Sequence, residues 1–270
     1  MQLIAVGDVL VDVVCDRMPE PGQRVHGSTS LRAGGSAVNA ALAAADAGAD
    51  ATVCGRIGGD PAGDLIVATL EARGVRGELA RDAELPTGVA VSFRDGGVVA
   101  DRGANASFSP SDLPTRLQAD ALLVSGFALL QDGSREAAQT ALDRFEGAWS
   151  AVDLASPKLA AGAEVDVGAT VVLATAAEAK ALTRLDPEPA ARELAMVFAV
   201  ACVKLGADGA IAVRGNDFER ARPVPVVRTS PFGAGDAFAA VFLVRLAGGD
   251  GLRTALEHAC AAGARAAGSG

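Results

Sequence analysis

Two glycines stand just before an acidic residue in the run Gly233-Ala234-Gly235-Asp236, and an apolar helical segment follows. The first N–H groups of a helix have no partner within the helix and carry a partial positive charge, so they attract anions. Glycine lets a phosphate approach those groups closely. A carboxylate at this place is suited to take a proton from a hydroxyl that then attacks a phosphoryl group. The run predicts phosphoryl transfer, with Asp236 as general base and the N–H groups of Gly233, Ala234 and Gly235 as an oxyanion hole. On local sequence alone, a turn with a capping Asp236 explains it about as well.

A second glycine pair, Gly34-Gly35, opens an alanine-rich segment that contains Asn39. If a helix begins near Ser36, Asn39 lies in its first turn, where its amide can donate to and accept from hydroxyl groups. Taken alone, this pattern is better explained as a helix start with an ordinary polar residue. Together, the two glycine motifs resemble the two signatures of the ribokinase/PfkB carbohydrate kinase family, and the order, separation and flanking patterns agree along nearly the whole chain.

The resemblance implies ATP-dependent phosphorylation of a sugar hydroxyl, with Asp236 as base. It assigns sugar binding to Gly34, Gly35 and Asn39, and also to Asp12, four residues after Asp8. Asp8 and Asp12 are an even number of residues apart, so on one strand they would face the same side. As an alternative, Asp12 could equally be a solvated charge on an edge strand.

Relatives carry a run similar to Arg102-Gly103-Ala104-Asn105 beside the substrate. Arg102 would bind a carboxylate or phosphate through two N–H donors of its planar guanidinium, and Asn105 would bind a hydroxyl. A turn that exposes a surface arginine is the alternative.

The family usually shows Asn-x-x-Glu where this chain has Thr175 and Glu178, and that motif organises Mg²⁺ and its waters. Glu178 would therefore act on the metal through water, unless it is only an exposed residue of a helix's first turn, favoured by the helix dipole.

Nucleotide binding is the second role that the resemblance implies. The residues that it assigns to ATP are Lys204, Gly206, Gly209, Ala259, Ala262 and Gly263. Lys204 would meet a phosphate as a point charge, although Gly206 to Gly209 is equally an ordinary hairpin turn. In many relatives an Asp ahead of Gly-Ala-Gly-Asp helps to hold a monovalent cation, and Ser230 here weakens the case for such a cation.

Two other functions stay open at this point. A nucleoside kinase of the same fold would carry the same motifs. A catalytically weakened regulatory protein that binds sugar or nucleotide is suggested by Ser230 and Thr175, which depart from the family pattern. A dinucleotide-binding dehydrogenase is disfavoured, because no Gly-x-Gly-x-x-Gly run follows a strand.

Composition excludes several classes of protein. The 270 residues are half hydrophobic, which suffices for one large α/β domain. The net charge is −9, and the scattered Lys and Arg argue against a nucleic-acid partner. The cysteines, Cys15, Cys54, Cys202 and Cys260, have no paired spacing, which suits a reducing cytosol. No apolar run approaches transmembrane length and no signal peptide begins the chain, so we expect a cytoplasmic protein without membrane contact.

Strand-like runs alternate with helical segments, which predicts a mostly parallel sheet with helices on both faces. We expect residues 1–270 to form one ribokinase-like domain, a three-layer α/β/α sandwich. Residues 9–30 and 75–102 do not follow this alternation of strands and helices. We expect them to form antiparallel strands outside the main sheet. The resemblance favours a small lid sheet over an edge extension, and an exposed lid could pair with a second copy of the chain. The expected helices are residues 36–47, 63–73, 134–145, 176–184, 187–197, 233–246 and 251–267.

Overall fold

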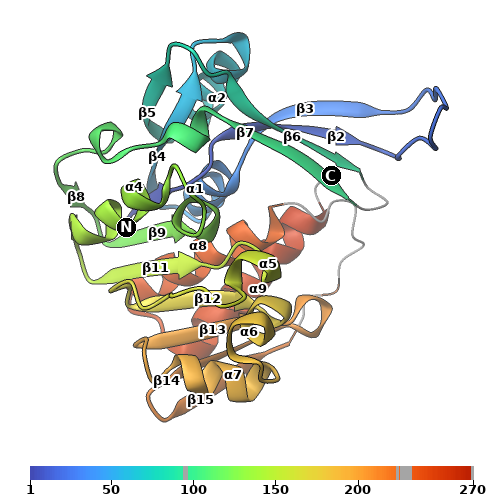
Figure 1. Ribbon diagram of the computed structural model, residues 1–270. Coiled ribbons are helices and arrows are strands. Elements are labelled where there is room, and N and C mark those ends of the chain that lie inside the picture. The colour runs from blue at the N-terminus through green and yellow to red at the C-terminus, as the bar shows by residue number, and fades with distance from the viewer. Residues whose placement is uncertain (94–96, 223–224, 226–232, 269–270) are drawn as a thin grey trace.

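The computed structural model of the protein describes residues 1–93, 97–222, 225 and 233–268. Within these residues the largest sheet has nine strands in the order β15-β14-β13-β12-β11-β9-β1-β4-β5 (Figure 1). The seven strands from β13 to β5 run parallel, and β14 and β15 extend the sheet antiparallel. Their bounds are β1 Gln2–Val6, β4 Asp50–Gly58, β5 Arg76–Asp82, β9 Ala121–Ser125, β11 Trp149–Asp153, β12 Val171–Thr175, β13 Val200–Lys204, β14 Ala210–Arg214 and β15 Asp217–Ala221.

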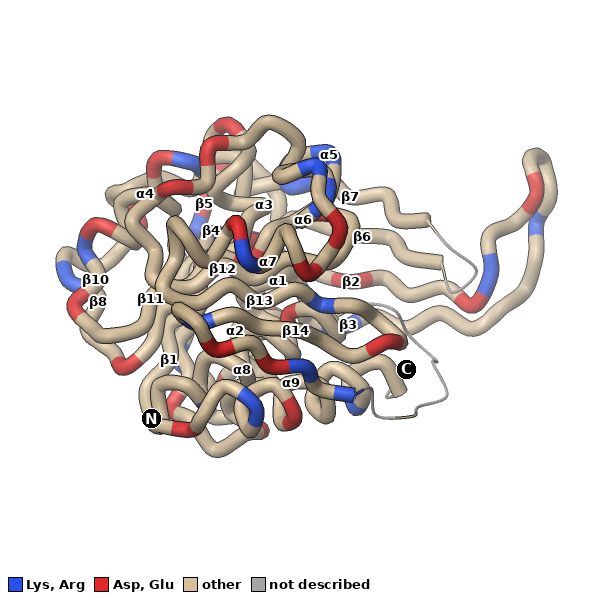
Figure 2. The backbone as a smooth tube through the Cα atoms, turned by 90° about the horizontal axis from the view of Figure 1, so that it is seen from below, with Lys and Arg blue, Asp and Glu red and all other residues tan. Residues whose placement is uncertain are grey.

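Helices cover both faces of this sheet, so the predicted three-layer α/β/α arrangement is confirmed. Figure 2 separates the layers, with α4 and α5 above the sheet and α8 and α9 below it. One face carries α1 Ser36–Asp46, α2 Pro61–Ala72, α8 Ala234–Ala247 and α9 Leu252–Gly268. The other carries α3 Gly126–Leu129, α4 Arg135–Asp143, α5 Pro157–Ala160, α6 Ala176–Thr183 and α7 Pro187–Leu194.

A second sheet of four strands forms the lid, and it stands apart from the sandwich (Figures 1 and 2). Its order is β3-β2-β6-β7, with β2 Leu10–Cys15, β3 Thr29–Gly34, β6 Thr87–Phe93 and β7 Val98–Gly103. A short pair, β8 Leu117–Gln118 and β10 Phe145–Glu146, lies at the opposite end of the molecule.

Part of the expected lid belongs elsewhere. Strand β5, inside the segment 75–102, pairs in parallel with β4 and is the edge of the main sheet. The lid is also not purely antiparallel, because β2 and β6 pair in parallel. Alternation and turn signals show that a strand exists, but they do not identify its partner.

The expected helices are present, with small differences at their ends. The helix expected at 134–145 ends at Asp143, because Phe145 enters β10, and the one expected at 187–197 ends at Leu194. No helix among the described residues is long and apolar enough to cross a membrane.

Helix α8 is the inner support of the site. Its residues from Ala237 to Val244 are all buried, because the helix lies among α1, α9 and the sheet. A helix that is apolar on every side has this buried place in a fold. Its first turn is therefore held rigidly against the edge of the sheet where the parallel strands end.

Candidate active site

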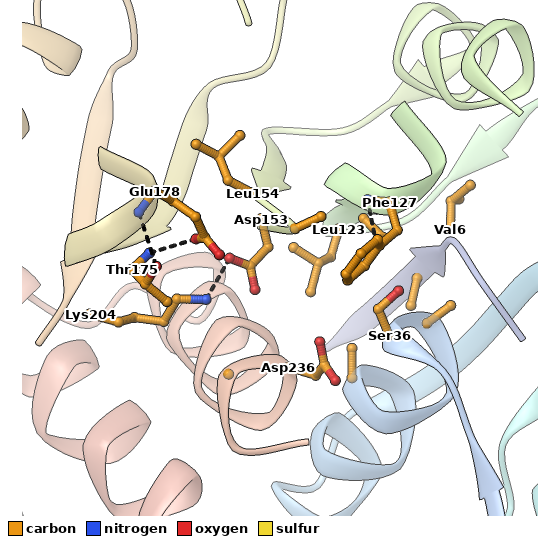
Figure 3. Close-up of a pocket in the computed structure, with 16 residues that line it drawn as sticks. Val6, Ser36, Leu123, Phe127, Asp153, Leu154, Thr175, Glu178, Lys204 and Asp236 are labelled. Atoms are coloured by element: carbon orange, nitrogen blue, oxygen red, sulfur yellow. Dashed lines mark hydrogen bonds and ion pairs between the residues drawn. The ribbon is translucent and has the colours of Figure 1, made fainter. Parts of the chain in front are cut away.

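Asp236 lies in the first turn of α8 and faces a cavity of about 140 Å³. Its carboxylate is partly exposed to that cavity (Figure 3). Asn39, in the first turn of α1, donates a hydrogen bond from Nδ2 to Asp236 Oδ2 over 2.9 Å. The two glycine motifs therefore meet, as the sequence predicts.

The start of α8 has the geometry of an anion site. Gly233 has φ 77°, a left-handed conformation that glycine adopts without strain, and its carbonyl accepts the first helical hydrogen bond, from Ala237. Gly235 lines the cavity beside Asp236. The N–H groups of this first turn have no acceptor within the helix and carry its positive dipole end.

The surroundings of Asp236 favour a carboxylate that can accept a proton. Burial raises the pKa of Asp236 above its ordinary 3.8, while the Asn39 hydrogen bond and the charge of Lys204 oppose that rise. A base with a raised pKa holds an abstracted proton more firmly than an exposed carboxylate does.

A buried ion pair lies across the cavity, at the ends of the two strands that flank β12 (Figure 3). Lys204 at the end of β13 forms an ion pair with Asp153 at the end of β11, 2.5 Å between Nζ and Oδ1. Burial raises the pKa of Asp153 to about 7, against the opposing charge of Lys204. Burial lowers the pKa of Lys204, but the charge and hydrogen bond of Asp153, together with the charges of Glu178 and Asp236, outweigh burial and raise that pKa, so the ammonium stays charged.

Glu178 lines the same cavity and is buried, in contrast to the exposed helix residue of the alternative interpretation. It forms a capping box with Thr175: Thr175 N–H donates to Glu178 Oε2 over 2.7 Å, and Glu178 N–H donates to Thr175 Oγ1 over 3.2 Å. Only one carboxylate oxygen is used in this way.

These acidic groups fit Mg²⁺ held mainly by phosphates and water. Among the described residues, no three carboxylate, histidine or cysteine side chains lie close enough to hold a metal ion by themselves. Mg²⁺ in phosphoryl-transfer sites takes one or two carboxylates and completes its shell with phosphate oxygens and water. Glu178 and Asp153 both line the cavity where such an ion would lie.

Asp12 lies on the lid strand β2 and is buried, 7% exposed. It pairs with Arg32 across the β2–β3 ladder, 3.6 Å from Oδ2 to Nε. Burial raises the pKa of Asp12, Arg32 lowers it, and the negative charge of Asp236 adds to the rise. The Asp12 and Asp236 carboxyl groups therefore lie close enough for the charge of one to act on the other.

The glycine pair allows this close packing. A Cβ on Gly34 would lie 2.3 Å from Asp12 Oδ2. Gly35 has φ 91°, and a Cβ there would lie 2.3 Å from the carbonyl oxygen of Asp8.

Arg102 and Asn105 do not have the free side chains that the sequence suggested. Arg102 Nη2 donates to Asp8 Oδ1 over 2.8 Å and to Ser134 Oγ over 2.7 Å. The Asn105 amide is 1% exposed and bonds to both the N–H and the carbonyl of Val9, each over 2.8 Å. Arg102 at the end of β7 and Asn105 in η1 (Ala104–Ser107) are thus both held against the turn after β1, and substrate binding by either one stays a prediction.

The expected nucleotide residues lie in different settings. Gly206 is exposed at the end of β13, while Gly209 is buried with φ 89°. Ala259 is fully buried in the core and cannot touch a ligand, which corrects that expectation. A Cβ on Gly263 would lie 3.0 Å from the Ala234 carbonyl, so this glycine lets α9 pack on the start of α8. Ala262 lines a separate groove.

The departure from the family pattern at Ser230 lies outside the described residues.

Two residues of the cavity have no motif that identifies them. Asp153 ends a buried strand, and nothing nearby in the sequence marks it. Ser36 is the first residue of α1, and its Oγ is buried against the cavity without a hydrogen-bond partner in the described structure. The only sequence signal for Ser36 is its place after Gly34-Gly35.

Comparison with known proteins gives one family. The model of the pfkB family carbohydrate kinases matches residues 2–270. Comparison with curated proteins gives no match.

Several solved kinases have the same fold. Adenosine kinase from Sinorhizobium meliloti is 21% identical, with a TM-score of 0.85 over 97% of this chain and 92% of that one. Aminoimidazole riboside kinase from Salmonella enterica is 25% identical, with a TM-score of 0.80 over 99% and 93%. Fructokinase from Vibrio cholerae O395, in a fructose-, ADP- and calcium-bound form, is 25% identical, with a TM-score of 0.83 over 98% and 92%.

Proposed function

Because the chain belongs to the pfkB family of carbohydrate kinases, we propose that Asp236 is the general base of an ATP-dependent kinase acting on a sugar-like hydroxyl. ATP-dependent phosphorylation of a sugar or nucleoside is the activity of the family and of its structural neighbours. The observation that carries the assignment of the base is the hydrogen bond between Asn39 and Asp236 at the cavity where α8 begins.

In the proposed reaction, the acceptor hydroxyl donates its proton to the free oxygen of Asp236 while its oxygen attacks the γ-phosphorus of ATP. The P–O bond to ADP breaks, and ADP leaves with that electron pair. Asn39 holds the carboxylate in one orientation, and the first N–H groups of α8 stabilise the charge that develops on the phosphoryl oxygens.

Lys204 and Glu178 serve the nucleotide side in this proposal. Lys204 Nζ lies 3.6 Å from where a Cβ of Gly235 would be, so its charge adjoins the proposed oxyanion hole. Mg²⁺ bound with ATP would neutralise the phosphates, and Glu178 would orient the waters of that ion.

The acceptor is a sugar or a nucleoside, and the neighbours at 25% identity include one kinase of each kind. An ADP-release assay over ribose, fructose, glucose, adenosine and aminoimidazole riboside tests the proposal. We expect saturable, Mg²⁺-dependent turnover with at least one acceptor. Ligand-induced stabilisation in thermal melts without turnover would instead support the regulatory binding protein.

The lid suggests a dimer as a further part of the proposal. Leu31 is 62% exposed on the edge strand β3, and Val98 and Val99 are 50% and 68% exposed on the other edge strand, β7. Exposed apolar edge strands pair readily with a second copy. Light scattering after gel filtration should give twice the monomer mass of 26.9 kDa. The Val99→Lys variant should have the mass of the monomer.

We place the protein in the cytoplasm. All four cysteines are free, three of them buried, which suits a reducing compartment. Fractionation of the source cells with an antibody to the protein tests this.

A further inference from the structure

Thr87 is the first residue of the lid strand β6, and it is 3% exposed at the junction between the lid and the sandwich. Its N–H and its hydroxyl both donate to the carboxylate of Asp60, over 2.8 Å to Oδ2 and 2.7 Å to Oδ1. Its Oγ1 accepts a third hydrogen bond, from the N–H of Gly58 over 2.9 Å. These contacts, here called the Asp60–Thr87 clamp, join the start of β6 to the last residue of β4 and to the N-cap of α2.

The clamp leaves little space for movement. A Cβ on Gly58 would lie 2.5 Å from Thr87 N, and one on Gly63 would lie 3.0 Å from Thr87 Oγ1. Asp60 is itself held in place, because it accepts a hydrogen bond from the Gly63 N–H over 2.9 Å. Two of the three bonds at Thr87 go to a carboxylate, and such charge-assisted hydrogen bonds are about twice as strong as neutral ones.

The connection that leads into β6 is also fixed where it begins. Asp82, the last residue of β5, accepts hydrogen bonds at Oδ1 from the N–H groups of Glu84 and Leu85, over 2.9 and 2.8 Å. Arg56 of β4 donates from Nε to Asp82 Oδ2 over 2.9 Å. Because both ends of this connection are bonded to the sandwich, β6 leaves the sandwich in one direction.

The position of β6 sets the position of Asp12. Strands β2 and β6 are the two central strands of the lid and pair in parallel, with Asp12 opposite Ala90. A change in the direction of β6 at Thr87 would therefore move the Asp12 carboxyl group relative to Asp236. Those two groups lie close enough for their charges to interact.

We propose that Thr87 and Asp60 are positioning residues, which hold the lid in one orientation so that Asp12 stands beside Asp236 before the acceptor binds. The inference deepens the proposed function and rests on it, because it assigns part of acceptor binding to a junction that does not line the cavity. If the junction is loose, only a fraction of the molecules has the lid in place. The apparent Kd for the acceptor then rises by the inverse of that fraction.

The kinetics of Thr87→Val test the clamp, with ADP release measured for the acceptor of the panel that turns over best. The valine side chain has the shape of threonine but cannot donate to Asp60 or accept from Gly58. We expect the acceptor KM to rise about 10-fold, as for the loss of a hydrogen bond to a charged group, and kcat to stay within about twofold, because a saturating acceptor holds the lid in place. A clamp that only stabilised the fold would lower the active fraction, and therefore kcat, at an unchanged KM.

Three further variants separate the hydroxyl from its surroundings. Thr87→Ser keeps the hydroxyl and should keep a KM close to that of wild type. Asp60→Asn keeps the cap of α2 but turns an N–H₂ group toward a donor of Thr87, so it should raise KM as Thr87→Val does, and it replaces Thr87→Val if that variant does not fold. Thr69→Val is the matched control, because the Thr69 hydroxyl donates within α2, to the Leu65 carbonyl over 2.7 Å. It should have the KM of wild type.

Amide hydrogen exchange without any ligand, followed by mass spectrometry, tests the junction independently of turnover. A bonded amide exchanges through local opening of the structure. In Thr87→Val we expect residues 10–15 and 87–93, which form β2 and β6, to exchange about 10-fold faster than in wild type. Residues 234–247 of α8 should exchange at the wild-type rate. Thr69→Val should leave the exchange of both lid strands unchanged.

A wild-type KM in a folded Thr87→Val, or a fall in kcat at constant KM, would overturn the inference and leave the proposed kinase intact. So would an equal rise of KM in Thr87→Ser, since the hydroxyl would then not be the cause. Unchanged exchange of the lid strands would contradict the clamp at any level of activity. Faster exchange in a protein that phosphorylates no acceptor would contradict the proposed function and still support the clamp.

Discussion

Asn39 and Asp236 are 197 residues apart in sequence, and their side chains are joined by a 2.9 Å hydrogen bond. Each lies in the first turn of a helix, α1 or α8, and each helix begins after a glycine with positive φ, Gly35 or Gly233. The bond therefore fixes two helix starts against one another at the cleft under the lid. The amide donates to one oxygen of Asp236, and in the proposed reaction the other oxygen takes the proton of the acceptor hydroxyl.

Asp236→Asn should abolish most of the activity. The amide has nearly the same shape but cannot take a proton, and loss of a general base costs about 10²- to 10⁴-fold in kcat. The measurement is ADP release with the best acceptor. The melting temperature and acceptor binding should stay close to wild type, because the carboxylate is not part of the core. A loss smaller than tenfold would show that Asp236 is not the base.

Asn39→Ala should shift the pH dependence of kcat/KM. Burial raises the pKa of Asp236, and the Asn39 hydrogen bond opposes it, so removing that bond raises the pKa further. The base then ionises at higher pH, and the acidic limb of the profile moves to higher pH. We expect about a tenfold loss at acidic pH, the size of a hydrogen bond to a charged group, and a smaller loss at alkaline pH. An equal loss at every pH would mean that Asn39 only positions the acceptor.

Asp153 should make the protein less stable as the pH rises. Burial raises its pKa from 3.8 to about 7 in the native state, against the opposing charge of Lys204. Between these values the native state holds more protons than the unfolded state. The corresponding stability is fully present below the unfolded pKa and is lost as the pH rises through about 7. Urea denaturation should show the free energy of unfolding falling by up to about 1.4 kcal/mol per pH unit.

Asp153→Asn is the control for that prediction, because it removes the titrating group. The slope across this range should flatten, and above about pH 7 the variant also leaves Lys204 without its charged partner. An unchanged slope would assign the pH dependence to another group.

The sequence predicts the helix starts better than the side-chain partners. Gly34-Gly35 and Gly233-Ala234-Gly235 mark positions where the backbone needs glycine, and such local requirements can be recognised without the fold. The partners of Arg102 and Asn105 could not be predicted, because an arginine or an asparagine binds whichever group the tertiary structure brings to it. Here those groups are Asp8, Ser134 and the backbone of Val9.

The same limit explains the strand and helix positions that were misplaced. Strand β5 has the alternation of a lid strand but completes the main sheet, because register depends on its neighbour β4. Ala259 lies on a helix face of small residues, and such a face can contact either a ligand or other residues of the core. Here α8 packs on α9 and buries Ala259 in the core. Asp153 could not be predicted, since its role depends on the end of β11 lying two strands from that of β13.

Gly34→Ala and Gly35→Ala should have different effects although they are neighbours. At Gly34 the new methyl group would meet the Asp12 carboxylate, which can move, so we expect a higher KM for the acceptor and about 1 kcal/mol or less lost in stability. At Gly35 it would meet the backbone of Asp8 in a positive-φ conformation, so we expect a stability loss of about 1–3 kcal/mol. Chemical denaturation and acceptor KM measure both. Equal destabilisation would show that Asp12 is as rigid as the backbone.

Ser36→Ala should make the free protein no less stable and the enzyme slower. The Ser36 hydroxyl is buried beside Asp236 without a partner, and an unsatisfied buried hydroxyl costs about 1–3 kcal/mol. Its removal should therefore leave the free energy of unfolding unchanged or raise it. If the hydroxyl donates to the transferring phosphoryl group, kcat should fall about two- to tenfold with little change in the KM of the acceptor. Ser36→Thr keeps the hydroxyl and should retain more of the rate. A variant with wild-type kcat would show that the hydroxyl is a structural defect without a role in the reaction.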